Sequence, residues 1–182
     1  MLAVSETGDP TGAYYQYAFE FTDFPDYPKF GVWPDGYYFT INQFAPPSLG
    51  FAGAAICVVD RAAMLSGDPN AEIQFFNLGT SYGSLLPADA DGLTQPAAGS
   101  PNYLANMGYN SLRIWEANID WTTPSNSAIS LVQNLSVQPY SYSGISISQP
   151  GTSQTLDALA SRLMYRLQYR NFGTYEVLLT NH

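Results

Sequence analysis

The chain has very little cysteine, histidine and positive charge. The single Cys57 cannot form an intramolecular disulfide or a cysteine zinc cluster, and the single His182 argues against a Ser/His/Asp triad or a multi-histidine metal centre. Lysine and arginine number only 6 and the net charge is −9, which disfavours nucleic acid and anionic membranes as partners. We expect no cofactor on these grounds and lean against an enzyme.

Long hydrophobic runs are also missing. No stretch of roughly 20 apolar residues could span a bilayer, and the first residues, MLAVSETGDP, have neither the basic start nor the apolar stretch of a signal peptide. We therefore expect no membrane partner, and any export signal would lie outside this chain. Aromatic residues, in contrast, make up 15% of the sequence, a composition that favours β-structure.

A turn phrase occurs three times, and each copy lies between two strand-like apolar runs. The copies are Gly8–Ala13, Gly67–Ala71 and Thr123–Ala128. Their prolines are separated by roughly 55–60 residues, and turn chemistry at a regular spacing of this size is typical of a β-architecture with repeated blades. The sequence therefore predicts an all-β protein built from β-propeller blades.

Period-two alternation and turn residues predict twelve strands. They are Leu2–Ser5, Tyr14–Phe21, Lys29–Trp33, Tyr37–Phe44, Ala54–Val59, Ile73–Leu78, Ser84–Pro87, Tyr103–Met107, Ser111–Ile119, Ala128–Val137, a strand from Arg162 onward, and Thr174–Thr180. A short helical turn beginning near Thr155 is predicted to precede the strand from Arg162. The stretch from Ala88 to Pro101 is predicted to be too polar for the core, and Ser141–Ser153 a Ser/Gly/Pro-rich connection.

Twelve strands suffice for three four-stranded blades in a single domain, 1–182. One blade would be split between residues 1–21 and 155–182. Because closed propellers usually have about four to eight blades, we expect a homodimer whose terminal strands complete a six-bladed ring. A monomeric sandwich of two sheets is the alternative.

Several blocks resemble a family of bacterial secreted β-propeller proteins over nearly the whole chain. They are DPTGAYYQYAFEF, FPDYPKFGVWPDGYYFTINQF, GAAICVVDRAAML, SLLPADADG, QPGTSQTLDALASRLMYRLQYRNFG and LLTNH. The resemblance implies a propeller fold and an extracytoplasmic origin. It implies no particular activity, since the family has no settled biochemical role. Its members are longer, so the chain resembles an excised piece of a propeller.

The innermost strand of each blade lines the central channel of a propeller, where ligands usually bind. The predicted innermost strands begin at Asp26, Leu85 and Arg162. The candidate ligand-binding residues on them and beside them are Asp26, Tyr27, Lys29, Trp33, Asp35, Arg162, Tyr165, Arg166 and Tyr169. Arginine and tyrosine suit carboxylates and sugar hydroxyls. The opposite charges could equally neutralise one another as a structural feature.

Two further groups of acidic residues could carry chemistry. Asp89 and Asp91, before Gly92, resemble part of a calcium loop, but the remaining ligands of such a loop are missing and an Asx-type turn is the more common explanation. Asp26, Asp35, Asp89 and Glu176 could supply the carboxylate pair of a glycan hydrolase. The sequence thus favours a non-catalytic binding and assembly module for a small polar ligand, glycan or peptide. The alternatives are a glycan-active hydrolase and a propeller fragment with no independent activity.

Overall fold

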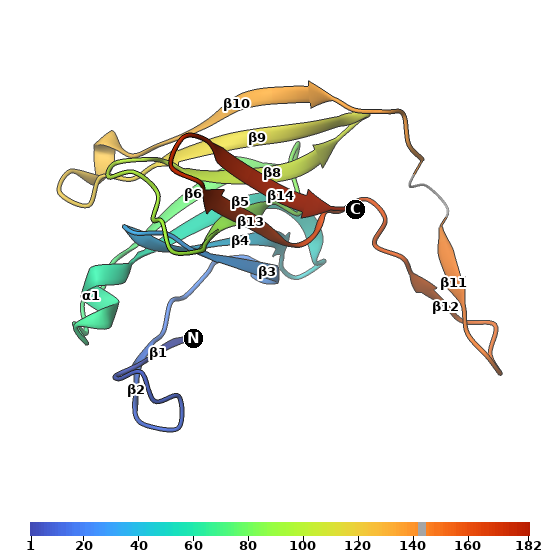
Figure 1. Cartoon of the computed structure of the whole chain (residues 1–182). Helices are drawn as coiled ribbons and strands as arrows, with labels where there is room; N and C mark the ends of the chain where they lie inside the picture. The colour runs from blue at the N-terminus through green and yellow to red at the C-terminus, as the bar shows by residue number, and fades with distance from the viewer. Residues whose placement is uncertain (142–144) are drawn as a thin grey trace.

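The computed structural model describes residues 1–141 and 145–182 and is an all-β protein, as the sequence predicts. Two layers of sheet enclose the main core, and two hairpins lie outside these layers (Figure 1). In the described ranges no helix is long and apolar enough to cross a membrane.

The first sheet has the order β3-β4-β5-β6, all antiparallel. This arrangement confirms the predicted first set of four strands. The strands are β3 (Phe24–Val32), β4 (Gly36–Ala45), β5 (Gly50–Asp60) and β6 (Ile73–Gly79).

Strands β4 and β5 are buried on both faces because their side chains alternate between two cores. Tyr38 and Ile56 belong to the core between the two layers, whereas Phe39 and Cys57 belong to a second core on the opposite face. The second core is covered by helix α1 (Arg61–Leu65) and by the hairpin of β1 (Leu2–Ser5) and β2 (Tyr14–Tyr17). Helix α1 was not predicted from the sequence.

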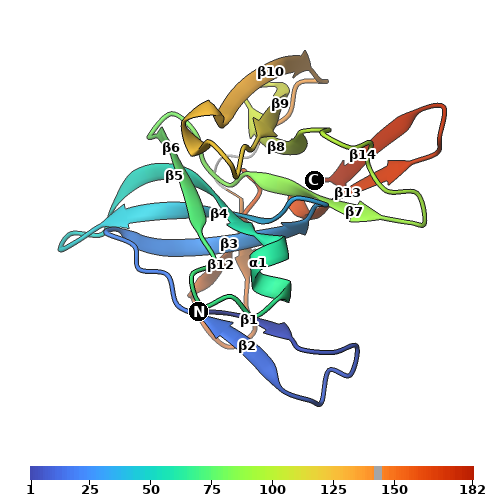
Figure 2. The same cartoon turned by 90° about the vertical axis from the view of Figure 1, so that its left-hand side faces the viewer.

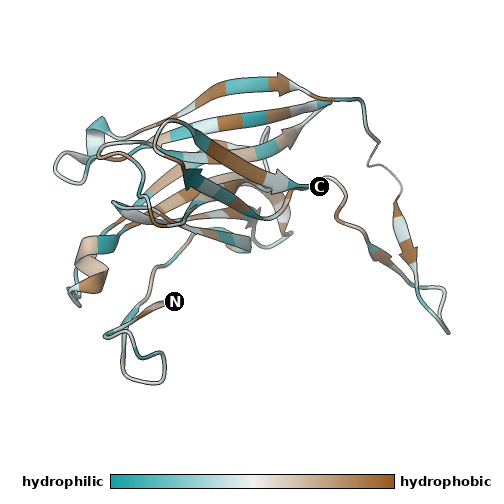
Figure 3. Cartoon of the chain, in the orientation of Figure 1, coloured by the Kyte–Doolittle hydropathy of each residue, from teal (hydrophilic) through white to brown (hydrophobic). Residues whose placement is uncertain are grey.

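The second sheet has the order β10-β9-β8-β7-β13-β14. Figure 3 shows alternating hydrophilic and hydrophobic residues along its strands, which is the period expected for a sheet with one face on a core. The strands are β7 (Leu86–Asp91), β8 (Asn102–Gly108), β9 (Ser111–Asn118), β10 (Ala128–Ser136), β13 (Met164–Asn171) and β14 (Glu176–Asn181), and the 3-10 turn η1 (Pro124–Asn126) precedes β10.

Strand β7 changes partner along its length. Leu86 and Pro87 pair antiparallel with β8, whereas Ala88–Asp91 pair in parallel with β13. The six-stranded sheet is therefore two smaller sheets joined through β7, one of four strands and one formed by β13 and β14. The prediction that residues from Ala88 onward lie outside the core is wrong at Ala88, which is fully buried, while Asp89 points to the opposite face.

The predicted helical turn near Thr155 is also wrong. Thr155–Asp157 form strand β12, which pairs with β11 (Ser146–Ser148) in a hairpin that projects from the body (Figure 1). Strand β11 lies in the predicted connection, of which residues 142–144 lie outside the described part. The described residues thus hold fourteen strands instead of the twelve predicted.

The three copies of the turn phrase each connect consecutive antiparallel strands. They link β1 to β2, β5 to β6 and β9 to β10. In the first two copies an aspartate accepts the backbone N–H two residues on, at 2.9 Å for Asp9 and 2.8 Å for Asp68. Asp120 lies just before the third copy, and it accepts the Thr122 N–H at 2.9 Å in the same way. The prediction that the phrase forms turns between strands is confirmed, and the aspartates in or beside it form Asx-turns.

Candidate functional site

The strands β3, β7 and β13 meet at the centre of the molecule (Figure 2). These are the three strands that the sequence predicts to be innermost, and each is the first strand of its own group. β3 lies so close to β7 that a Cβ added at Gly31 would be 2.4 Å from the Ala88 carbonyl oxygen. Because the three strands converge, the charged residues beside them come together from distant parts of the sequence.

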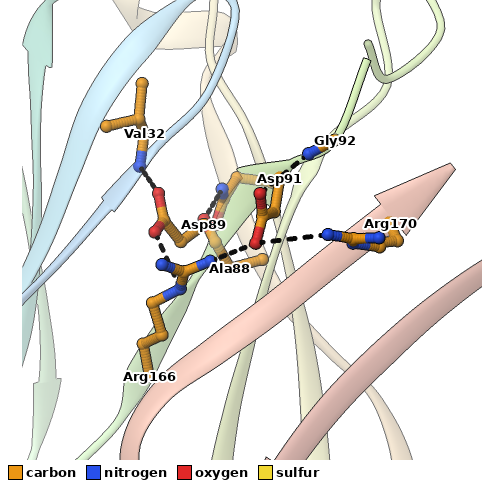
Figure 4. A network of polar contacts seen from close by, with 8 residues as sticks. Val32, Ala88, Asp89, Asp91, Gly92, Arg166 and Arg170 are labelled. Carbon is orange, nitrogen blue, oxygen red and sulfur yellow. Dashed lines mark hydrogen bonds and ion pairs between the residues drawn. The ribbon is translucent and has the colours of Figure 1, made fainter. Parts of the chain in front are cut away.

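At one place in this centre, two aspartates of β7 meet two arginines of β13 (Figure 4). Arg166 Nε lies 3.1 Å from Asp89 Oδ2, and the Arg166 Nη2 group donates to Asp91 Oδ2. Arg170 is more distant, at 3.9 Å from Asp91. The Val32 backbone N–H donates to Asp89 Oδ1 at 3.0 Å, so this network also fastens β3 to β7. The four formal charges sum to zero, which favours the structural interpretation of this cluster.

The sequence also suggests Asp89 and Asp91 as calcium ligands. Their carboxylates face arginines, and within residues 1–141 and 145–182 no group of three or more metal-binding side chains is close enough to hold an ion. Gly92 N–H donates to Asp91 Oδ1 at 2.8 Å, a local turn contact. A calcium site here stays a prediction without support from the geometry.

A second cluster gathers two cations on one tyrosine. Lys29 Nζ lies 3.4 Å from the centroid of the Tyr27 ring, and Arg162 Cζ lies 4.5 Å from the same centroid. Burial lowers the pKa of Lys29, the nearby Arg162 lowers it further, and Asp26 opposes both effects. Tyr27 has φ of 56° and lies in a register irregularity of β3, so its backbone is held in a conformation that few residues adopt.

The remaining candidates are placed differently. Trp33 and Tyr169 are each 1% exposed and pack into the core, so they do not line an open channel. Tyr165 is largely exposed. Asp35 lines a separate cavity of about 200 Å³ together with Trp33. Burial raises the pKa of Asp35, although a hydrogen bond from the Tyr38 hydroxyl at 3.0 Å lowers it in part.

The carboxylates considered for hydrolysis have separate partners. Tyr38 donates to Asp35, and Arg166 pairs with Asp89. Glu176 lies near Tyr169, and burial raises the pKa of Tyr169 first, with the negative charge of Glu176 raising it further. Asp35 and Asp89 are therefore each engaged in a structural contact.

Next to Arg162, an open cleft of about 410 Å³ lies between the two layers. The polar side chains that line it are Asn42, Ser81, Ser84, Asn106, Arg113, Ser161 and Arg162. Of these only Arg162 was singled out from the sequence. Asn42, Asn106 and Arg113 lie inside strands and belong to no motif. Only the scarcity of positive charge, with lysine and arginine together numbering 6, could have drawn attention to Arg113.

Comparison with family models, with curated proteins and with solved structures finds no match to this chain. The resemblance to secreted β-propeller proteins accordingly stays a prediction from the sequence.

Proposed function

We propose that this chain is a non-catalytic binding and assembly module, a β-propeller piece of about three blades that a second copy completes to a six-bladed ring. The observation that carries the proposal is the meeting of β3, β7 and β13, each the first strand of a blade-like group, at one centre. In propellers the blades are arranged radially around such a centre.

The third group is incomplete, which supports pairing with another copy. Among the described residues it consists of β13 and β14, and β14 is the last strand of its sheet. Apolar side chains are exposed on and beside β14, among them Tyr175 and Leu179 at 58% and 60%. An unpaired strand edge with exposed apolar residues is a template for another strand.

The N-terminal hairpin is the segment that would complete this group. It is a separate two-stranded sheet, an arrangement that is marginal by itself. Tyr17 anchors it to its own chain, because this side chain is buried and its hydroxyl donates to the Met64 carbonyl at 2.9 Å. The hairpin can remain anchored in this way and still offer an unpaired edge to β14 of a second copy.

Light scattering coupled to size exclusion tests the assembly. We expect a mass near twice the 19.9 kDa of one chain. The variant Val177→Lys/Leu179→Lys places charge on the β14 edge and is expected to give a monomer. Leu93→Lys, which replaces a fully exposed leucine in a loop, is the control and should stay dimeric. A wild-type protein that is monomeric at every concentration would overturn the proposal.

Deleting the N-terminal hairpin is a poorer test. The hairpin covers the second core, so its removal exposes apolar side chains of β4 and β5 in the same chain. Loss of solubility would then report on folding and not on assembly.

A further inference from the structure

The cleft of about 410 Å³ is positively charged in a protein of net charge −9. Arg113 and Arg162 both line it, and its lining includes no aspartate or glutamate. Within the part of the chain that the structure describes, neither arginine makes an ion pair, whereas Arg166 and Arg170 both do. Two unpaired guanidinium groups at one cleft attract an anion.

Each of these arginines rests on a tyrosine ring. Arg113 Cζ lies 5.2 Å from the centroid of Tyr82, and Arg162 Cζ lies 4.5 Å from that of Tyr27. A guanidinium stacked on a ring is held in place while its N–H donors remain free for a carboxylate. The tyrosines therefore position the arginines without neutralising them.

The polar floor of the cleft is preformed. Asn42, 5% exposed, accepts the Ser84 N–H at 2.8 Å and donates to the Ser84 hydroxyl at 3.2 Å. Asn106, 1% exposed, donates to the Gly83 carbonyl and accepts from the Trp115 indole at 3.0 Å. Ser84 is held at φ of 53°, a strained backbone of the kind that accumulates at binding sites.

Two aromatic rings complete the lining of the cleft. Phe44 and Phe51 line it with their rings edge to face, 5.8 Å between centroids, and Phe51 is 43% exposed. Exposed aromatic rings stack on the apolar faces of sugars, and hydroxyl groups such as that of Ser84 suit sugar hydroxyls. Cations, hydroxyls and rings together fit a ring compound that carries a carboxylate.

We propose that this cleft binds a sugar acid, such as a uronic acid residue of a glycan, with Arg113 and Arg162 on the carboxylate and Phe51 under the sugar ring. This inference rests on the binding role proposed above and names its ligand class. It requires only one chain and does not depend on the dimer.

Calorimetric titration with a trigalacturonate and with the neutral trigalactose tests the inference. We expect the acid to bind at least tenfold more tightly than the neutral sugar, because hydrogen bonds to a charged carboxylate are stronger than those to neutral hydroxyls. The double variant Arg113→Gln/Arg162→Gln should lose this preference, while Phe51→Ala should weaken both sugars. Arg170→Gln, an exposed arginine outside the cleft, is the control and should bind like the wild type.

Equal binding of the two sugars, no binding of either, or an unchanged preference in the double variant would overturn the inference. A peptide with a free C-terminal carboxylate that binds more tightly than the trigalacturonate would also overturn it, in favour of a peptide ligand. Melting temperatures of all variants show whether the fold is intact.

The same samples separate this inference from the assembly proposal. A dimer that does not bind the acid contradicts only the cleft assignment, whereas a monomer that binds it contradicts only the assembly.

Discussion

The rings of Trp33 and Tyr169 meet edge to face with centroids 4.7 Å apart and so link the residue that follows β3 to β13 inside the core. Both side chains are almost fully buried, and the Trp33 indole N–H donates to the Ser100 carbonyl at 3.1 Å. This contact is one of the links that hold the three first strands at a common centre.

Replacing Trp33 with alanine should destabilise the protein strongly. Removing a large buried aromatic side chain costs about 3–5 kcal/mol of unfolding free energy, through lost burial and the cavity that remains. Urea unfolding followed by circular dichroism measures the change. Tyr109→Ala removes an exposed aromatic ring and should change the stability by no more than about 0.5 kcal/mol. Equal effects of the two variants would contradict the placement of Trp33.

Gly31→Ala tests the close approach of β3 and β7. The added methyl group would be 2.4 Å from the Ala88 carbonyl oxygen, so one strand must move. We expect a loss of about 1–3 kcal/mol, the usual cost of overpacking. Gly8→Ala, where nothing lies within 4 Å of the new methyl group, is the matched control and should be neutral or slightly stabilising. A neutral Gly31→Ala would show that the two strands are farther apart.

The pair of Asp89 and Arg166 should show measurable energetic coupling. In a double-mutant cycle with Asp89→Asn and Arg166→Gln, we expect a coupling of about 1 kcal/mol, between the values of surface and buried ion pairs, because both groups are only partly exposed. The cycle for Asp91 and Arg170, which are 3.9 Å apart and more exposed, should give a coupling near zero. Coupling in the second cycle but not in the first would contradict the network.

Asp120 should stabilise the third turn only while it is ionised. Its carboxylate accepts the Thr123 N–H at 2.7 Å and the Asn126 amide at 3.1 Å, and these hydrogen bonds lower its pKa from the usual 3.8. A carboxyl group whose pKa is lowered by folding contributes stability above its unfolded pKa and loses it as the pH falls through the folded pKa.

Asp120→Ala should therefore lower the melting temperature at neutral pH, and the difference from the wild type should disappear in acid below the folded pKa. Differential scanning calorimetry between pH 2 and pH 7, at roughly half-unit steps, measures both effects. Ser125→Ala, an exposed residue of the same turn, should have little effect at any pH. A pH-independent difference for Asp120→Ala would mean that its charge is not involved.

Much of the fold is predictable from the sequence because its signals are local. Alternating residues mark most strands within a few residues, and in the first two turn phrases an aspartate fixes the following backbone by its own hydrogen bonds. Helix α1 was missed because five residues within an apolar run show no helical period. Asp60 caps it by accepting the Ala63 N–H at 3.0 Å.

The candidate site was less predictable because its contacts are distant in sequence. The period of the strand from Arg162 correctly places Arg166 and Arg170 on one face, but nothing local shows that Asp89 and Asp91 lie opposite them. Trp33 and Tyr169 were predicted to face a channel, but both side chains are buried in the core. An aromatic residue in an alternating strand fits either position, so the sequence did not distinguish them.

The change of partner along β7 also affects the order in which parts of the chain can fold. The antiparallel strands of the first sheet pair with sequence neighbours and can form as soon as they are synthesised. Ala88 pairs with Leu167, far along the sequence, so this junction must wait until the C-terminal region is available. Until then this edge of β7 is unpaired. The charges of Asp89 and Asp91 would disfavour its pairing with the edge strand of another chain.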